Sequence, residues 1–237
     1  MKIEVRDSYA SLSESASEII FNEIKARRKL LICAATGNTP VGTYACLAER
    51  YRQEPQLFDA IHILKLDEWG GLEMNDPATC EFFLQNHLIK PLQISGSRYI
   101  SFNSNAPDPE GECKRVQAEL DQRKPIDICI LGLGLNGHIA LNEQADSLTP
   151  MIHLAALSEK STHHSMLSGL KNKPGYGLTL GMADILQSRM IIMMISGKEK
   201  KEICSAFLSG GITTRVPASF LWLHPNTICL VSRDAME

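Results

Sequence analysis

The chain has 237 residues, a formal net charge of -3, and a composition of 44% hydrophobic and 22% charged residues. These values are typical of a globular protein with a substantial core. Because the sequence has no long run of lysine or arginine, we expect no nucleic-acid partner and no binding to an anionic membrane. No apolar stretch reaches the ~20 residues of a membrane helix, and the N-terminus lacks a signal-peptide pattern, so we expect a cytoplasmic protein.

Seven cysteines are spread along the chain without a Cys-x-x-Cys pair. Their odd number and their positions within apolar runs are typical of free thiols in a reducing compartment. The histidines show no spacing that is typical of metal ligands. We therefore expect no metal site.

The first predicted helix begins after Ser8, a suitable N-cap, and ends near Arg27 and Arg28. One apolar face recurs every four residues along it, at Leu12, Ala16, Ile20 and Ile24. A buried strand over 29–35 and a turn over 36–40 follow. The next helix is predicted over 41–51, with Thr39 as its cap and Pro40 in its first turn.

Apolar strands and amphipathic helices continue to alternate along the rest of the chain. Further strands are predicted at 61–66, 99–102, 126–131, 152–157, 190–195 and 227–231. Further helices are predicted at 78–89, 109–122 and 198–208, and a connection rich in glycine and lysine at 169–177. This order predicts a single α/β domain over residues 1–237, with a doubly wound, mostly parallel sheet flanked by helices in a Rossmann-like three-layer sandwich.

Ligands of such sheets bind outside the carboxyl ends of the strands, so the residues that directly follow each strand are candidate site residues. The richest segment runs from Ile126 to Glu143, where an apolar strand enters a glycine-rich turn that carries His138. The other segments are 36–39, 67–69 and 197–200. Chemistry is expected near His138.

The turn after the first buried strand can present backbone N–H groups and two hydroxyls to an anion such as phosphate. Its residues are Thr36, Gly37, Asn38 and Thr39. It lacks the Gly-Lys-Ser/Thr ending of a Walker A loop, and a plain tight turn would use the same residue types. Both interpretations stay open.

Asp67 and Glu68 directly follow a strand, where burial can raise a carboxylate pKa toward that of a useful general base. Only one of them can easily face a given pocket, because adjacent strand residues point to opposite faces. The alternative is that both merely cap the next turn. His138 and Glu143 can form an orienting pair for proton transfer, although a lone histidine is more often structural.

Two further features are ambiguous. Lys200 can reach a phosphate, but its helix start is basic throughout and can simply be solvated. The glycines Gly132, Gly134 and Gly137 also match a dinucleotide-binding fingerprint, with Glu159 as the ribose-binding acid. The segment after Gly137 leaves room for only a short helix, which disfavours that interpretation.

Three motifs together resemble the glucosamine-6-phosphate deaminase/isomerase family along nearly the whole chain. They are Ala-Thr36-Gly-Asn-Thr-Pro, Leu-Asp67-Glu-Trp and Gly-Leu-Asn-Gly-His138-Ile-Ala-Leu-Asn-Glu143. Within the family, Leu-Asp67-Glu-Trp, the segment Pro77 to Leu84 and the segment Ala218 to Pro225 look most like the galactosamine-6-phosphate branch. The related 6-phosphogluconolactonases typically carry Asp-Glu-Arg where this chain has Asp-Glu-Trp, so deaminase is preferred over lactone hydrolase.

The resemblance implies acid-base deamination of an amino sugar phosphate without a metal or organic cofactor. Asp67 would move a proton between carbons 1 and 2, while His138, supported by Glu143, would open the sugar ring. The implied substrate-binding residues are Thr36, Gly37, Asn38, Thr39, Gly137 and Lys200. A homo-oligomer is compatible with the sequence, and a binding protein for a sugar phosphate or nucleotide, without turnover, is a further alternative.

The chain departs from the family pattern at two positions. Asn136 stands where the family usually has an aspartate, and it cannot supply the negative charge that raises histidine basicity. Leu167 aligns with a phosphate-binding arginine, whose loss normally weakens phosphate recognition. We expect that one of four nearby residues or a neighbouring subunit takes over that role: His163, His164, Lys171 or Lys173.

Overall fold

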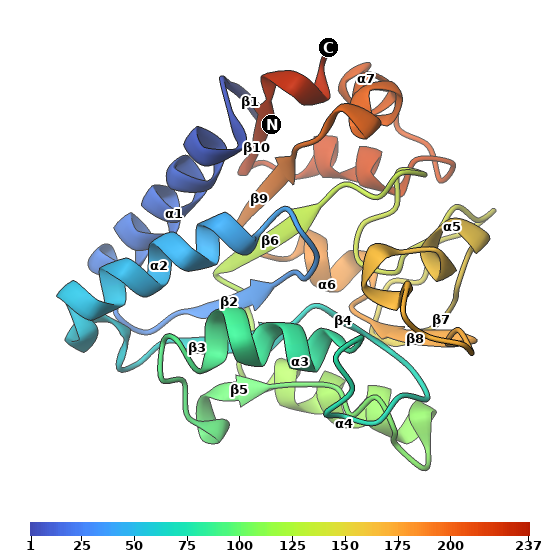
Figure 1. The fold of residues 1–237 in the computed structure, drawn as a ribbon, viewed down its shortest axis with the longest axis horizontal. Coiled ribbons are helices and arrows are strands. Elements are labelled where there is room, and N and C mark those ends of the chain that lie inside the picture. The colour runs from blue at the N-terminus through green and yellow to red at the C-terminus, as the bar shows by residue number, and fades with distance from the viewer.

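The computed structural model describes residues 1–237 and contains two β-sheets. The larger sheet has seven parallel strands in the order β1-β10-β9-β6-β2-β3-β5. The strands are β1 (Lys2–Arg6), β2 (Leu31–Ala34), β3 (His62–Lys65), β5 (Tyr99–Ile100), β6 (Ile128–Gly132), β9 (Met190–Ile195) and β10 (Thr227–Ser232). The predicted parallel sheet flanked by helices is confirmed (Figure 1).

Seven α-helices connect the strands. They are α1 (Tyr9–Ala26), α2 (Val41–Gln53), α3 (Cys80–Leu84), α4 (Pro109–Asp121), α5 (Glu159–Thr162), α6 (Met182–Leu186) and α7 (Lys201–Leu208). Ser8 caps α1 as predicted, because its side chain accepts a hydrogen bond from the amide of Ser11. The prediction for α2 is wrong at its cap, because Pro40 occupies that position and Thr39 lies one residue further out. The amide of Gly42 in the first turn instead donates to the hydroxyl of Tyr9 at 2.8 Å.

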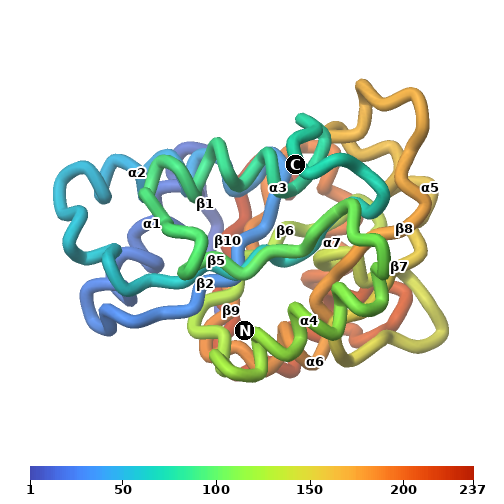
Figure 2. The backbone as a smooth tube through the Cα atoms, turned by 90° about the horizontal axis from the view of Figure 1, so that it is seen from below, coloured from blue at the N-terminus to red at the C-terminus, as the bar shows by residue number.

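Helices cover both faces of the seven-stranded sheet, as a three-layer sandwich requires. Alternate residues of each strand point to opposite faces, so in β2 Ile32 packs with α1 and α2 while Cys33 packs with α4 and α6. Two separate cores of 25 and 31 buried residues result, one on each face. Figure 2 shows α1 and α2 on one side of the sheet and α4 and α6 on the other.

The smaller sheet was not anticipated. It is antiparallel, in the order β4-β8-β7, and consists of β4 (Asp67–Trp69), β8 (Tyr176–Thr179) and β7 (His153–Ala156). The strand predicted at 152–157 therefore belongs to this sheet and not to the parallel one. The pairing of β4 with β8 joins segments about a hundred residues apart, and no local sequence pattern reveals it. The smaller sheet lies beside α5, at the right of Figure 1.

Other differences from prediction are local. Neither the edge strand β1 nor the short helix α6 was predicted. The helix predicted at 78–89 is α3 followed by a π-helical turn over Gln85–Ile89, and the helix predicted at 198–208 begins with a 3-10 turn before α7. No helix is long and apolar enough to cross a membrane. That residues 1–237 form one domain stays a prediction.

The chain reverses its direction of travel across the large sheet between β2 and β6. From β2 the order runs through β3 to β5 on one side, and from β6 through β9 to β10 on the other. The loops that follow β2 and β6 therefore diverge and leave a crevice at the carboxyl ends of these strands. Doubly wound sheets bind their ligands at such a switch point.

Candidate active site

A cavity of about 420 Å³ lies at this switch point. It is bounded by the loop after β2, by β4, by the loop after β6, by the α5 region and by the start of the turn before α7. Seven of the ten predicted site residues line it: Thr36, Gly37, Asn38, Thr39, Asp67, His138 and Lys200. The other three, Asn136, Gly137 and Glu143, lie outside the lining.

The loop after β2 forms one wall of the cavity. Tyr44 of α2 holds the loop at its start, where the phenol donates to the carbonyl oxygen of Ala35 at 2.7 Å. Gly37 has φ of 93°, a left-handed conformation that a glycine adopts without strain. The Thr36 hydroxyl donates to Sγ of Cys80 at 3.3 Å and so ties the loop to α3.

Asp67 is a buried carboxylate that lines the cavity. Its side chain is 8% exposed, and burial together with the negative charge of Glu68 raises its pKa to about 7, although the positive charge of Lys65 acts in the opposite direction. The thiol of Cys80 lies 3.8 Å from Oδ1 of Asp67. Glu68 is fully buried outside the cavity, so only one of the adjacent acids faces it, as strand geometry predicts.

His138 lies in the loop after β6 and lines the cavity, and Glu143 is its carboxylate partner. Nδ1 of His138 lies 3.4 Å from Oε2 of Glu143, and the same oxygen accepts a hydrogen bond from Nδ2 of Asn136 at 2.7 Å. The amide N–H of His138 donates to Oδ1 of Asn136 at 3.2 Å. Asn136 therefore links the two partners and holds their geometry.

Glu143 remains ionised over the working range of most enzymes. Burial would raise its pKa, but hydrogen bonds and charge from His138, with Ser161 and Asn136 as further donors, lower it to about 2. The Ser161 hydroxyl donates to Oε1 of Glu143, and its own oxygen lies 3.4 Å from Nδ1 of His138. This serine, from α5, was not among the predicted site residues.

The glycines after β6 serve packing. A side chain at Gly134 would meet the His138 ring at 2.4 Å, so a glycine is required there for the ring to lie against the backbone. Gly137 faces Val216 and Ile203, and its carbonyl oxygen accepts from the amide of Ala218 at 2.9 Å. No helix begins after Gly137, so the dinucleotide fingerprint lacks the helix N-terminus it needs.

Cationic and imidazole groups also line the cavity. Nζ of Lys200 donates to the carbonyl oxygen of Leu133 at 2.6 Å, and burial lowers the pKa of this lysine. Burial also lowers the pKa of His164, with further contributions from His138 and Lys200. The His164 ring lies 5.8 Å from that of Trp69, so the imidazole is held against the cavity wall.

The four residues expected to compensate for the missing arginine separate into two pairs. His163 and His164 line the cavity, whereas Lys171 and Lys173 do not. The Lys173 amine instead donates to the carbonyl oxygen of Leu167, which is itself fully buried in a small core. Lys160, in the first turn of α5, lines the cavity and was missed, because its four-residue helix carries no periodicity.

Cys80 is a third residue at the site that the sequence did not reveal, after Ser161 and Lys160. It is buried between Thr36 and Asp67, but nothing in its local sequence distinguishes it from the other buried thiols. All seven cysteines are free. No group of three or more histidine, cysteine, aspartate or glutamate side chains is arranged to hold a metal ion.

A buried carboxylate that faces the same cavity as a histidine-glutamate pair, at the switch point of a doubly wound sheet, defines an acid-base site of an α/β enzyme. Residues 5–230 match the family of glucosamine-6-phosphate isomerases and 6-phosphogluconolactonases. The chain belongs to this family. The family predicted from its motifs is thereby confirmed, and with it the prediction of an enzyme.

Relatives within the family match nearly the full length of the chain. "Putative deaminase AgaI" of Escherichia coli (strain K12) is 40% identical over 95% of this chain and 90% of its own. Glucosamine-6-phosphate deaminase 1 of Bacillus subtilis (strain 168) is 34% identical over 99% and 98%. The solved structure of a monomeric glucosamine-6-phosphate deaminase of the NagB superfamily covers 100% of both chains at 33% identity, with a TM-score of 0.93.

A more distant likeness concerns the fold alone. The structure of 6-phosphogluconolactonase from Trypanosoma brucei is 21% identical, covers 99% of this chain and 97% of its own, and has a TM-score of 0.78. The lactonase and deaminase scaffolds are therefore the same, and the side chains of the cavity must distinguish the two activities.

Proposed function

We propose that this protein converts a hexosamine 6-phosphate and water to a ketohexose 6-phosphate and ammonia, with galactosamine 6-phosphate preferred over glucosamine 6-phosphate. The observation that carries the proposal is the presence of Asp67 and His138 on one cavity, with Glu143 directly behind the histidine. These groups supply a base for carbon and an acid-base pair for oxygen within reach of one bound sugar.

His138 opens the sugar ring in the first step. Its imidazole takes the proton from the hydroxyl on carbon 1 and returns a proton to the ring oxygen, which leaves an open-chain aldehyde. The ionised Glu143 stabilises the protonated imidazole between these transfers. Asn136 keeps the carboxylate of Glu143 oriented toward the imidazole ring. Asn136 therefore positions the charge of Glu143, although it supplies no negative charge of its own.

Asp67 performs the transfer between carbons. Its carboxylate removes the hydrogen from carbon 2, next to the aldehyde, and delivers it to carbon 1. The nitrogen-bearing carbon 2 then becomes an imine, water adds to it, and ammonia leaves. A carboxylate with a pKa near 7 is a far stronger base than a solvent-exposed aspartate and is still ionised at slightly alkaline pH.

The pKa of Asp67 leads to a pH prediction. Since the base must be ionised in the free enzyme, kcat/KM should be constant above about pH 7 and fall tenfold per unit below it. An acid limb near pH 4, where an ordinary aspartate titrates, would contradict this assignment. The measurement is the pH dependence of ammonia release at substrate concentrations well below KM.

In this proposal the phosphate group of the substrate binds to the loop Thr36–Thr39 and to the cationic side chains that line the cavity. Backbone and hydroxyl donors of the loop, Lys200, Lys160 and His164 all line that space. A second lysine and an imidazole replace a planar bidentate arginine with single-point donors. Lys160 and His164 thus take the position that the missing arginine leaves.

Replacing Lys200 with methionine should raise KM by roughly 10- to 100-fold while kcat changes much less, because one charge-assisted contact to the phosphate is lost. Lys201→Met is the matched control, since Lys201 is exposed and its amine reaches only the chain terminus. An unchanged KM for the Lys200 variant would place the phosphate elsewhere. Steady-state kinetics of both variants provide the measurement.

The preference for the galacto epimer rests on the Leu-Asp67-Glu-Trp motif and its companions, which resemble the galactosamine-6-phosphate branch. Trp69 lines the cavity, so this motif lies where it can contact the sugar. The test compares ammonia release from galactosamine 6-phosphate and glucosamine 6-phosphate, with hydrolysis of 6-phosphogluconolactone measured in parallel. Faster release from the gluco epimer would refute the preference, and lactone hydrolysis alone would refute the deaminase assignment.

A further inference from the structure

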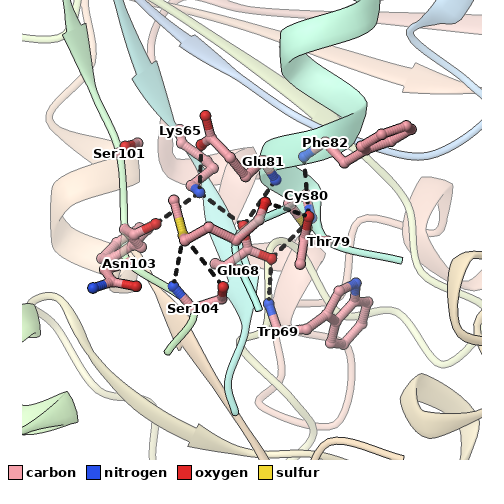
Figure 3. A network of polar contacts seen from close by, with 12 residues as sticks. Lys65, Glu68, Trp69, Thr79, Cys80, Glu81, Phe82, Ser101, Asn103 and Ser104 are labelled. Carbon is pink, nitrogen blue, oxygen red and sulfur yellow. Dashed lines mark hydrogen bonds and ion pairs between the residues drawn. The ribbon is translucent and has the colours of Figure 1, made fainter. Parts of the chain in front are cut away.

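A lysine two residues before the candidate base in the chain is completely buried. Nζ of Lys65 donates to Oε2 of Glu68 at 2.7 Å, to Oε2 of Glu81 at 2.9 Å and to the carbonyl oxygen of Phe102 at 2.8 Å, so all three of its protons are used (Figure 3). Its side chain and that of Glu68 have no exposed area. The resemblance to the family does not explain these contacts, because its motifs assign no role to Lys65 or Glu81.

The ion pairs shift the pKa values of two of these groups. Burial lowers the pKa of Lys65, but the two glutamates outweigh this and raise it, and the lysine in turn lowers the pKa of Glu81 against the effect of burial. Glu81 is held further by Nε2 of Gln85 at 2.8 Å and by the hydroxyl of Tyr99 at 2.9 Å. The cluster therefore places two acidic side chains around a single lysine inside the protein.

Glu68 connects this cluster to the cavity through α3. Its Oε1 accepts from the amides of Trp69 and Cys80, both at 2.8 Å, and its Oε2 accepts from the amide of Glu81 at 2.8 Å. These contacts fix the start of α3, and with it the Cys80 thiol that lies between Thr36 and Asp67. Figure 3 shows Glu68 placed between Lys65 and the first residues of α3.

A buried ion cluster of this kind is rarely the most stable arrangement, because apolar residues of similar volume are often as good or better. Glu68 directly follows Asp67 in the chain, and it also holds Cys80, which contacts the Asp67 carboxylate. This position indicates a role in function and not in stability. Glu68 and Lys65 act on the Asp67 carboxylate with opposite signs, the glutamate raising and the lysine lowering its pKa.

We propose that Lys65, Glu68 and Glu81 are positioning residues, a buried charge network that fixes Asp67 toward the cavity and controls the protonation of its carboxylate. The proposal rests on the proposed function, because it is Asp67 as the base that gives such control a purpose. None of the three touches the cavity, so they act through Asp67 and Cys80 and not on the substrate.

Other titratable groups also surround Asp67, and the test must separate them from the network. Those on β2, α2 and α3 that interact electrostatically with it are Cys33, Tyr44 and Cys80, and those that line the same cavity are His138, Lys160, His163, His164, Glu199 and Lys200. All of them are left in place when the network alone is changed.

The experiment follows the titration of Asp67 itself, by carbon-13 NMR of protein labelled at the aspartate carboxyl. The Asp67 signal is assigned by its loss in Asp67→Asn. Glu68→Gln should lower the titration midpoint by about one unit, since a negative neighbour is removed, and Lys65→Met should raise it by about one unit. The acid limb of kcat/KM should move in the same two directions.

A merely structural cluster would lower activity in both variants without moving the midpoint in opposite directions. Midpoints that do not move, move the same way, or move in only one variant would overturn the proposal. Asp127→Asn is the matched control, a half-buried carboxylate that pairs with Arg27 and Arg189 before β6 and should leave the Asp67 midpoint unchanged. If Lys65→Met does not fold, Lys65→Met/Glu81→Gln replaces it, with the same upward shift expected because the lysine charge next to Asp67 is still removed.

Failure of the proposed function gives a different result. If the wild-type protein releases no ammonia from either hexosamine 6-phosphate, the deaminase proposal is refuted, while the NMR midpoints still decide whether the network controls Asp67.

Discussion

Asp67→Asn is expected to lower kcat for ammonia release by roughly 10²- to 10⁴-fold, the range typical of a lost general base. An amide has nearly the same shape as the carboxylate but cannot accept the proton from carbon 2. Substrate binding should persist, because the phosphate contacts that we propose lie on the loop after β2 and at Lys200. The measurements are steady-state kinetics and exchange of the carbon-2 hydrogen with deuterated solvent, which should become undetectable in the variant.

A stability measurement on Asp67→Asn shows whether its loss of activity comes from unfolding. The folded-state pKa of Asp67 is raised to about 7, so ionisation of the buried carboxylate disfavours the folded state as pH rises above the unfolded value. Asparagine removes that penalty, and the variant should be at least as stable as the wild type at pH 8. Asp59→Asn, on the surface before β3, is the control and should change neither activity nor stability. Near-normal exchange in Asp67→Asn would show that another group is the base.

Lys65→Met is expected to lower the free energy of unfolding by about 3 to 5 kcal/mol. Removing the ammonium leaves Glu68 and Glu81 buried next to one another without their counter-charge. Adding Glu81→Gln should restore part of the loss, because one of the two unpaired carboxylates becomes neutral. Urea unfolding of the single and double variants gives this coupling directly.

The surface lysine Lys201 provides the comparison for this prediction. Lys201→Met removes the same charge at an exposed position and should change stability by less than about 0.5 kcal/mol. A loss below about 1 kcal/mol for Lys65→Met would mean that the buried glutamates become protonated or reach water when the lysine is gone. The charge network would then be weaker than its geometry indicates.

Much of the parallel sheet was predictable because its strands are buried on both faces. The strand β9, Met190–Ile195, is a continuous apolar run and was predicted at its observed bounds, and α1 was recognised from the Ser8 cap and its four-residue apolar repeat. The smaller sheet was not predictable in the same way. Its strands are three or four residues long, and β8 begins inside a segment rich in glycine and lysine.

The candidate site divides along similar lines. Asp67, His138 and the loop Thr36–Thr39 follow strands of the sheet, so strand ends alone placed them near one another. Ser161 and Lys160 reach the cavity on a four-residue helix without a recognisable pattern. Cys80 looks like any buried thiol in the sequence, and its contacts with Thr36 and Asp67 exist only because α3 packs against both loops.

The sequence by itself determined the doubly wound architecture, the family and the chemical character of the strand ends, because apolar periodicity and glycine-rich turns act over short distances along the chain. Only the tertiary structure decided that Asn136 joins Glu143 to His138, that Lys173 turns away from the cavity toward Leu167, and that Lys65 is buried between two glutamates. Burial and charge pairing depend on segments that meet across the fold. The proton affinity of Asp67 is therefore a property of the packed protein and not of its local sequence.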